Sequence, residues 1–299
     1  MLLLSLASAQ DSPWRLEVGA DVQATSHGVL TVAWRQEDLS AGLYTDTLEL
    51  RWSPEDEGGR AWLAGRVEVG AAGLMISPWT DGAPDPSRAM AAHYGGIEGG
   101  RLRYLPRGLY VGTAGSARVW AFTGGSPSLE PRLVLSPDLL VGWWSEPVHA
   151  WLRAGADVSP VVAPHLQLRV QARAPWRLAP FADLYLGVAS NQDEVTLTRL
   201  GGLNPYVVPL AGAAWGEFWV EDHAVAHVGA GWHGERIEAD LFSDLAAFDG
   251  ARTAAFGARL ALAHAPWSLE LKGGVAPWID RAPGVSPAAG WVLLSRGRR

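Results

Sequence analysis

The 299-residue chain contains no cysteine, which excludes a disulfide framework, a thiolate metal site and a cysteine nucleophile. Charged residues make up only 18% of it, against roughly 25% in soluble domains. The formal net charge is −7, so the chain is not expected to bind nucleic acid. No stretch reaches the roughly 20 apolar residues of a membrane-spanning helix. A chain with this composition can span a membrane only as a closed barrel of strands.

What the chain has in abundance is strict alternation of apolar and polar residues. In residues 165–173, every even position is apolar and every odd position is polar or charged. A period of two predicts a β-strand with one apolar face and one polar face. Similar segments recur along nearly the whole chain and predict about 14 to 18 strands. They include 43–53, 148–158, 194–200, 211–221 and 237–248, and 101–122 as either one long strand or a hairpin.

Tryptophan is the second abundant feature, with 16 Trp against 6 Tyr and 6 Phe. Its ring is apolar and its N–H needs a polar partner, so Trp is favoured at membrane–water interfaces. A soluble core is the alternative, but so many large rings are difficult to bury in one core. Most of the tryptophans lie near the ends of predicted strands, namely Trp14, Trp52, Trp79, Trp120, Trp143, Trp144, Trp176, Trp267 and Trp278.

These features together predict an all-β fold, an antiparallel transmembrane β-barrel. We expect residues 10–299 to form this single domain, integral to the outer membrane of a Gram-negative bacterium. Residues 1–9 resemble a short or truncated signal peptide, with Ala7-Ser8-Ala9 as its cleavage site. A soluble β-sandwich or propeller would also alternate. However, the polar faces here are strongly charged, and no propeller repeat of about 40 to 50 residues is found.

The polar face of such a barrel lines its lumen. Both signs of charge occur there, and two interpretations stay open. Ion pairs between neighbouring strands would stiffen the wall. Alternatively, a basic stripe around Arg153, Arg169 and Arg173 would face an acidic stripe in 217–238 and create a field across a pore. The predicted lumen-lining residues are Arg153, Gln167, Arg169, Gln171, Arg173, Glu217, His227, His233, Glu235, Glu238, Asp240 and Arg259.

No catalytic, cofactor or metal site is predicted. His227 and His233 lie six residues apart, which is about 20 Å along a strand and too far to share a metal ion. The Gly-x-Ser-x-Gly motif of a serine hydrolase is absent. The spacing of Asp222, His223 and Asp244 does not favour a hydrolase over chance. We therefore do not expect an enzyme.

One segment resembles a known family. Residues 198–206, Thr-Arg-Leu-Gly-Gly-Leu-Asn-Pro-Tyr, are similar to the Leu-Gly-Gly…Gly-Tyr region in the C-terminal barrel of Omp85-type surface antigens. Asn204-Pro205 stands where that family has an Arg-Gly pair. Residues 215–218, Trp-Gly-Glu-Phe, resemble the family's next strand, which carries a glutamate. The resemblance implies the barrel of an outer-membrane protein assembly or translocation machine.

The expected function is a passive, porin-like pore or the barrel component of an export or transport system, with a small solute or a polymer as substrate. A charge-filled barrel that anchors a partner without transport is the alternative. An Omp85-like assembly barrel or a membrane-embedded hydrolase comes third. Expected partners are outer-membrane lipid and periplasmic or export-system proteins, and no nucleic acid.

Overall fold

The computed structural model describes residues 14–22, 27–44, 47–68, 75–76, 79–80, 83–84, 90–124, 130–193, 195–201, 208–213, 218–264, 266–279 and 286–296. The predicted signal peptide lies outside the described residues. The described residues are mostly β-strands, with one short 3-10 turn at Pro106–Gly108. Among them, no helix is long and apolar enough to cross a membrane.

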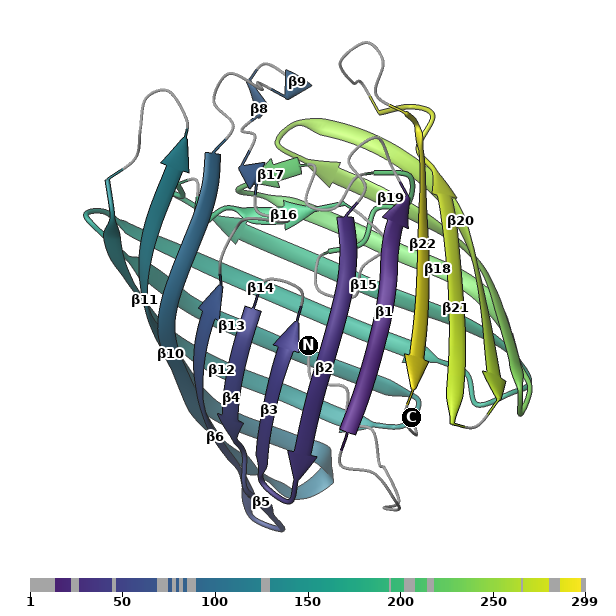
Figure 1. Ribbon diagram of the computed structural model, residues 1–299, viewed down its shortest axis with the longest axis horizontal. Coiled ribbons are helices and arrows are strands. Elements are labelled where there is room, and N and C mark those ends of the chain that lie inside the picture. Colours follow the sequence, from purple (N-terminus) through teal and green to yellow (C-terminus); the bar gives the residue numbers. More distant parts are fainter. Residues whose placement is uncertain are drawn as a thin grey trace.

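Sixteen antiparallel strands form the wall of the molecule (Figure 1). These wall strands are β1 (Trp14–Val22), β2 (His27–Gln36), β3 (Leu39–Tyr44), β4 (Thr47–Trp52), β6 (Gly59–Glu68), β10 (Met90–Tyr104), β11 (Leu109–Gly124), β12 (Arg132–Ser145), β13 (Val148–Val158), β14 (Val162–Arg173), β15 (Leu178–Ala189), β18 (His223–His233), β19 (Ile237–Phe248), β20 (Ala251–His264), β21 (Trp267–Val275) and β22 (Ala288–Arg296).

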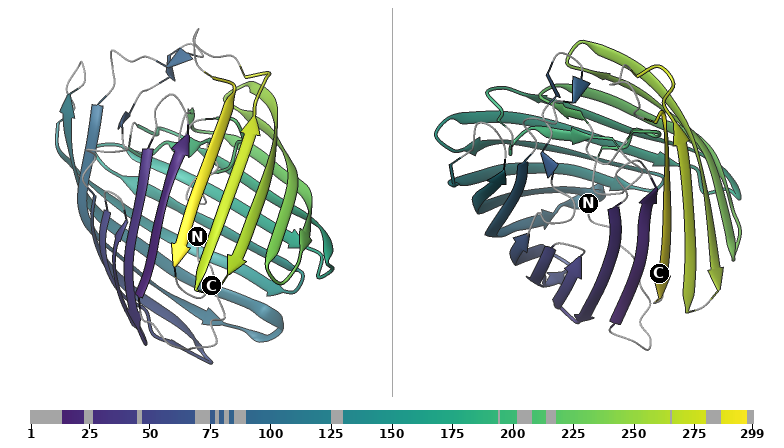
Figure 2. Two further views of the ribbon diagram at one scale, coloured as in Figure 1. Left: turned by 45° about the vertical axis from the view of Figure 1, so that its right-hand side comes forward. Right: turned by 45° about the horizontal axis from the view of Figure 1, so that its top comes forward.

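The pairings of the wall strands run around a ring. Each wall strand pairs with the next one along the chain. The last strand, β22, pairs with β1, from Leu16 opposite Arg296 to Val22 opposite Gly290. The views in Figure 2 show the strands tilted around a central space. The predicted antiparallel barrel is confirmed, and its strand number lies within the expected range.

Several short strands lie outside this ring. The strand β5 (Glu55–Asp56) extends the connection from β4 to β6, and β7 (Met75–Ile76) pairs with β10. The strands β8 (Trp79–Thr80) and β9 (Ala83–Pro84) pair with each other. Between β15 and β18, β16 (Thr198–Leu200) pairs with β17 (Phe218–Val220). The chain between β15 and β18, residues 190–222, is called the inserted segment below.

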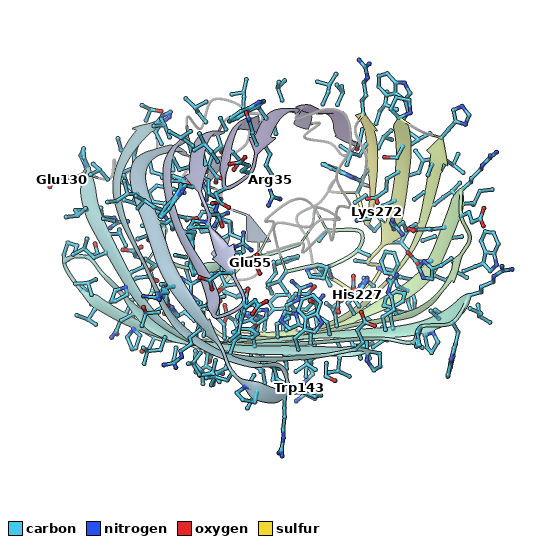
Figure 3. The ribbon with its side chains drawn as sticks, turned by 90° about the horizontal axis from the view of Figure 1, so that it is seen from below. Arg35, Glu55, Glu130, Trp143, His227 and Lys272 are labelled. Atoms are coloured by element: carbon cyan, nitrogen blue, oxygen red, sulfur yellow. The ribbon has the colours of Figure 1, made fainter. Side chains whose placement is uncertain are left out.

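Alternation gives the wall an apolar outer face and an inner face that carries most of its charge. On β19, Leu241 and Leu245 are 71% and 53% exposed, whereas Asp240 and Asp244 are 4% and 0% exposed. Seen from below, His227 and Lys272 point into the ring (Figure 3). A soluble protein rarely exposes a continuous apolar surface of this kind. Lipid contact explains it, because a closed barrel satisfies its backbone hydrogen bonds internally.

Tryptophan gathers at the end of the barrel that carries the short turns. Trp143 precedes the two-residue turn between β12 and β13, and Trp232 ends β18 next to the turn into β19. Trp267 begins β21 at the same end, and Trp176 lies in the turn after β14. All four are exposed, as expected for rings at a membrane–water interface.

Trp120 departs from that expectation. It is only 5% exposed and lies on the inner face of β11, where its ring centroid is 4.6 Å from that of Tyr94. Val134 belongs to the same interior cluster. Proximity to a strand end did not distinguish an interface ring from one that faces inward, because the two faces differ by a single residue of register. The side chains of Trp14 and Trp79 lie outside the described residues.

Three predicted segments form differently in the structure. Residues 43–53 belong to two paired strands, β3 and β4, with Leu43 opposite Leu48. The apolar phase changes there from odd to even positions, which was the missed signal of a turn. Among the described residues of 194–200 and 211–221, only Thr198–Leu200 and Phe218–Val220 are strands, and both lie outside the ring. Residues 101–122, by contrast, belong to the hairpin of β10 and β11, which is one of the two predicted alternatives.

Candidate functional site

The structure places most of the predicted lumen residues on five strands of one part of the wall, β13, β14, β18, β19 and β20. Glu235 lies instead in the exposed turn between β18 and β19, and Glu217 lies outside the described residues. The others are Arg153 on β13, Gln167, Arg169, Gln171 and Arg173 on β14, His227 and His233 on β18, Glu238 and Asp240 on β19, and Arg259 on β20.

Arg259 is the centre of the largest charged network. Its guanidinium donates to Glu270 at 3.0 Å, to Asp240 at 2.8 Å and to Glu238 at 2.9 Å. Lys272 lies 3.2 Å from Glu270 on the same strand. Three carboxylates from β19 and β21 therefore surround one guanidinium on β20, a geometry that suits the planar fork of arginine.

His233 extends this network toward β14. Its Nε2 lies 3.1 Å from an Arg173 nitrogen and 3.7 Å from Asp240. The Arg173 guanidinium also lies over the ring of Phe181, 4.9 Å from the centroid. The predicted residues of β14, β18, β19 and β20 thus meet on one part of the inner wall.

A second network lies on the opposite part of the wall. Glu98 on β10 has Arg51, Arg66 and Arg118 at 3.8, 3.8 and 3.6 Å. Arg66 also forms a hydrogen-bonded ion pair with Glu49 on β4. Sequence reasoning did not assign Glu98 to a strand, because the alternation is least regular just before it. In the structure, Glu98 lies on β10, paired with Ala64 on β6 and with Ser116 on β11.

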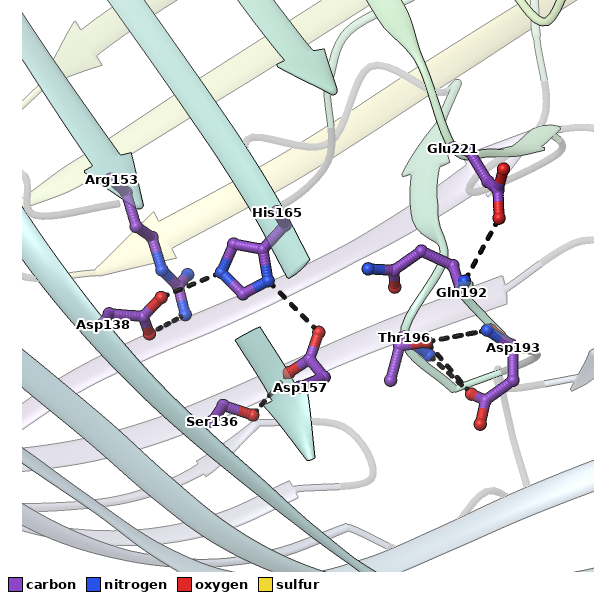
Figure 4. Close-up of polar contacts among 9 residues, drawn as sticks. All are labelled: Ser136, Asp138, Arg153, Asp157, His165, Gln192, Asp193, Thr196 and Glu221. Atoms are coloured by element: carbon purple, nitrogen blue, oxygen red, sulfur yellow. Dashed lines mark hydrogen bonds and ion pairs between the residues drawn. The ribbon is translucent and has the colours of Figure 1, made fainter. Parts of the chain in front are cut away.

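A third network joins β12, β13 and β14 (Figure 4). The buried carboxylate of Asp138 pairs with Arg153 and lies 2.8 Å from His165 Nε2. The other ring nitrogen of His165 lies 3.4 Å from Asp157, which also accepts a hydrogen bond from Ser136. The first residue of the alternating segment 165–173 is therefore held between two carboxylates.

Neighbouring opposite charges dominate the inner wall. Arg153 faces Asp138, and Arg169 lies 3.5 Å from Asp183 and stacks on Tyr185. These contacts correspond to the interpretation of ion pairs between neighbouring strands. Local pairing also weakens a field across the lumen, since Arg153 and Arg169 each have a carboxylate within a few ångströms.

The inserted segment covers an apolar patch on the inner wall. Its Leu200, Leu210 and Phe218 are fully buried or nearly so. The wall residues that they join in one cluster include Phe181, Phe242, Phe248 and Trp291. Sequence reasoning assigned a polar inner face throughout and missed this patch. The signal was present on β19, where residues 245–248, Leu-Ala-Ala-Phe, leave both faces apolar.

Asp244 fastens the inserted segment to the wall. One of its oxygens accepts the Ala211 backbone N–H at 2.6 Å, and the other pairs with Nδ1 of His227. The imidazole lies between two rings, 5.3 Å from Phe181 and 4.6 Å from Phe242. A fully buried carboxylate needs such partners, because an unpaired one costs several kcal/mol. We call this contact the Asp244 latch.

Gly212 brings the inserted segment against the end of β21. Its φ of +75° lies in the left-handed region, and a Cβ there would be 2.4 Å from the Ala276 nitrogen. Only glycine combines this conformation with so close a backbone approach. The segment therefore touches β19 through Ala211 and the end of β21 through Gly212.

Of the residues considered for a hydrolase, the two aspartates are engaged in other contacts. Asp222 accepts the backbone N–H of Ala189 at 3.1 Å, and Asp244 forms the latch. No group of three or more His, Cys, Asp or Glu suited to a metal ion is found among the described residues.

Comparison with known proteins supports the fold. No protein-family model matches the chain. No curated protein sequence matches it either. Among solved structures, CdiB from Acinetobacter baumannii is similar with a TM-score of 0.68 and 9% identity, over 95% of this chain and 59% of that chain. BamA from Haemophilus ducreyi lacking POTRA domains 1-3 is similar with a TM-score of 0.66 and 10% identity, over 96% of this chain and 71% of that chain.

CdiB from Escherichia coli is similar with a TM-score of 0.60 and 10% identity, over 97% of this chain and 64% of that chain. The chain thus spans 59% of the length of the Acinetobacter protein. At such low identity the likeness concerns the fold alone. It confirms an outer-membrane type of β-barrel.

Proposed function

We propose that this chain is an integral outer-membrane barrel that serves as a conduit, either as a pore or as the barrel component of an export system. We further propose that the inserted segment closes the conduit at rest. The Asp244 latch carries this proposal, because it fastens a segment that is not part of the wall to the inner face of β19. Outer-membrane lipid and periplasmic or export-system proteins are its proposed partners.

The size of the barrel and the nature of its contacts support gating. A barrel of sixteen strands is wide enough to hold an aqueous channel. Burial of Leu200, Leu210 and Phe218 favours the closed form by about 1.5–3 kcal/mol for each side chain. These contacts are non-covalent, so a substrate or partner that binds the open form more tightly would release the segment.

A second candidate is a barrel that anchors a partner and conducts nothing. The charged networks around Arg259 and Glu98 favour it, because paired charges stiffen a wall without requiring flow. Both candidates share the fold and the membrane, and they differ in whether the inserted segment ever leaves the inner wall.

A reversible tether tests the proposal. The chain has no native cysteine, so Ala211→Cys with Gly274→Cys introduces a single pair of thiols. A Cβ at Gly274 would lie 2.6 Å from that of Ala211. Disulfides need a Cβ separation of about 3.5–4.5 Å, so a movement of about 1 Å would allow the bond. Ala211→Cys alone is the matched control.

The readout is ionic conductance of the full chain in planar bilayers. We expect openings from the unmodified chain and the single variant, silence from the oxidised pair, and openings again after reduction. Openings from the oxidised pair equal to those of the control would contradict closure by the segment. Silence of every folded variant, including Asp244→Asn, would contradict the conduit and support the anchor.

A further inference from the structure

A polar cavity of about 160 Å³ lies between the inner wall and the start of the inserted segment. Ser136, Arg153 and Gln167 line it from β12, β13 and β14. Gln192, Thr196 and Glu221 line it from the inserted segment. Figure 4 shows these segment residues beside the network around His165. The cavity is smaller than the roughly 300–1,000 Å³ of pockets for drug-sized ligands, so any occupant is small.

Both sides of the cavity are held in place. Asp193 pairs with Arg132 on β12 at 3.2 Å, and the Gln192 backbone N–H donates to Glu221 at 3.1 Å. Asp193 and Thr196 close a tight turn through hydrogen bonds of 2.8 and 3.2 Å. On the wall side, the network of Asp138 and His165 fixes the lining side chains. The space is therefore a preformed site with defined geometry.

Two buried polar atoms in the lining have no hydrogen-bond partner among the described residues. They are the amide oxygen Oε1 of Gln192, an acceptor, and Nε of Arg153, a donor. Buried polar atoms are nearly always paired, because leaving one unpaired forfeits its hydration. An occupant that satisfies both must donate to one atom and accept from the other. A hydroxyl group does both.

The charges of the lining favour neither an anion nor a cation. Two arginines, Arg118 and Arg153, and two carboxylates, Asp157 and Glu221, line the cavity, so neither sign is in excess. We infer that this cavity binds a small neutral polyhydroxylated molecule, of the size of one sugar ring or less. This inference does not depend on the conduit, since the site is formed in the closed barrel.

Ligand-observed NMR titration of the detergent-solubilised full chain tests this site. The neutral probes are D-glucose and myo-inositol, and the anionic probe is inorganic phosphate. Gln192→Leu removes the unpartnered acceptor at similar volume. Ala189→Leu adds bulk to the cavity lining, and Ala182→Leu adds the same bulk on the outer face of the same strand.

We expect at least one neutral probe to bind the unmodified chain and the Ala182→Leu variant. Its affinity should fall at least ten-fold in Gln192→Leu and in Ala189→Leu. Failure of both neutral probes to bind would mean that the cavity holds only water and would overturn the inference. Tighter binding of phosphate, or equal affinity in all variants, would overturn it as well. None of these readouts depends on conductance.

Discussion

An arginine at Leu241 should destabilise the barrel far more than an arginine at Gln171. Leu241 is 71% exposed on the outer face of β19, a strand of 12 residues. It lies one to two residues from the strand centre, which is roughly 5 Å along the strand and less after the strand's tilt. At that depth, arginine facing lipid costs about 2–4 kcal/mol. Gln171 lies on the inner face of β14, where its side chain hydrogen-bonds His149, so we expect a loss of only about 1 kcal/mol.

Equilibrium unfolding by urea in lipid vesicles, followed by tryptophan fluorescence, measures both free energies. Leu241→Met is the control for altered shape, and its cost should stay below about 1.5 kcal/mol. Equal losses for the arginines at Leu241 and Gln171 would refute the assignment of the outer face to lipid. A loss in Leu241→Met as large as that in Leu241→Arg would show that packing, and not lipid contact, governs this position.

Three further outcomes are expected from the same unfolding assay. Arg259→Met should lower the free energy of unfolding by about 3–5 kcal/mol, because it leaves three carboxylates without their cation. Arg177→Met, in an exposed turn, should change it by less than about 0.5 kcal/mol, and similar losses in both variants would contradict the network. Asp244→Asn should lower the free energy of unfolding by about 1–3 kcal/mol and raise the open probability in bilayers. Unchanged conductance would refute the role of Asp244 as a latch. Gly212→Ala should lower the free energy of unfolding more than Gly250→Ala. Both glycines have a positive φ, at which an alanine costs about 1–2 kcal/mol in strain, but only at Gly212 would the new Cβ meet close backbone atoms. Equal losses would contradict this close approach.

The charged networks give the inner wall a mixed character. Arg153, Arg169 and Arg259 each face a carboxylate on a neighbouring strand, so a solute in the lumen would meet alternating signs instead of one continuous field. Rings or stripes of a single sign are the usual basis of ion selectivity. If the barrel conducts, we therefore expect weak discrimination between small cations and anions.

Much of the wall was predictable from single strands. Val148–Val158 and Ile237–Phe248 form with the bounds that alternation predicts, because each strand has one face toward lipid and one away from it. Prediction failed where a residue's environment depends on distant chain. Trp120 turned out to face the interior cluster, and Glu98 found its arginines through pairing with β6 and β11.

The sequence by itself determined that this protein is a two-faced sheet without cysteine chemistry, since a period of two is a local property of each segment. Only the tertiary structure decided which charges meet, since partners such as Arg259 and Glu270 lie on separate strands whose register sets their distance. It also decided that residues 198–200 and 218–220 leave the wall. Their apolar side chains pack against Phe242 and Phe248 inside the barrel, because alternation shows that a face is apolar but not whether lipid or another part of the chain will cover it.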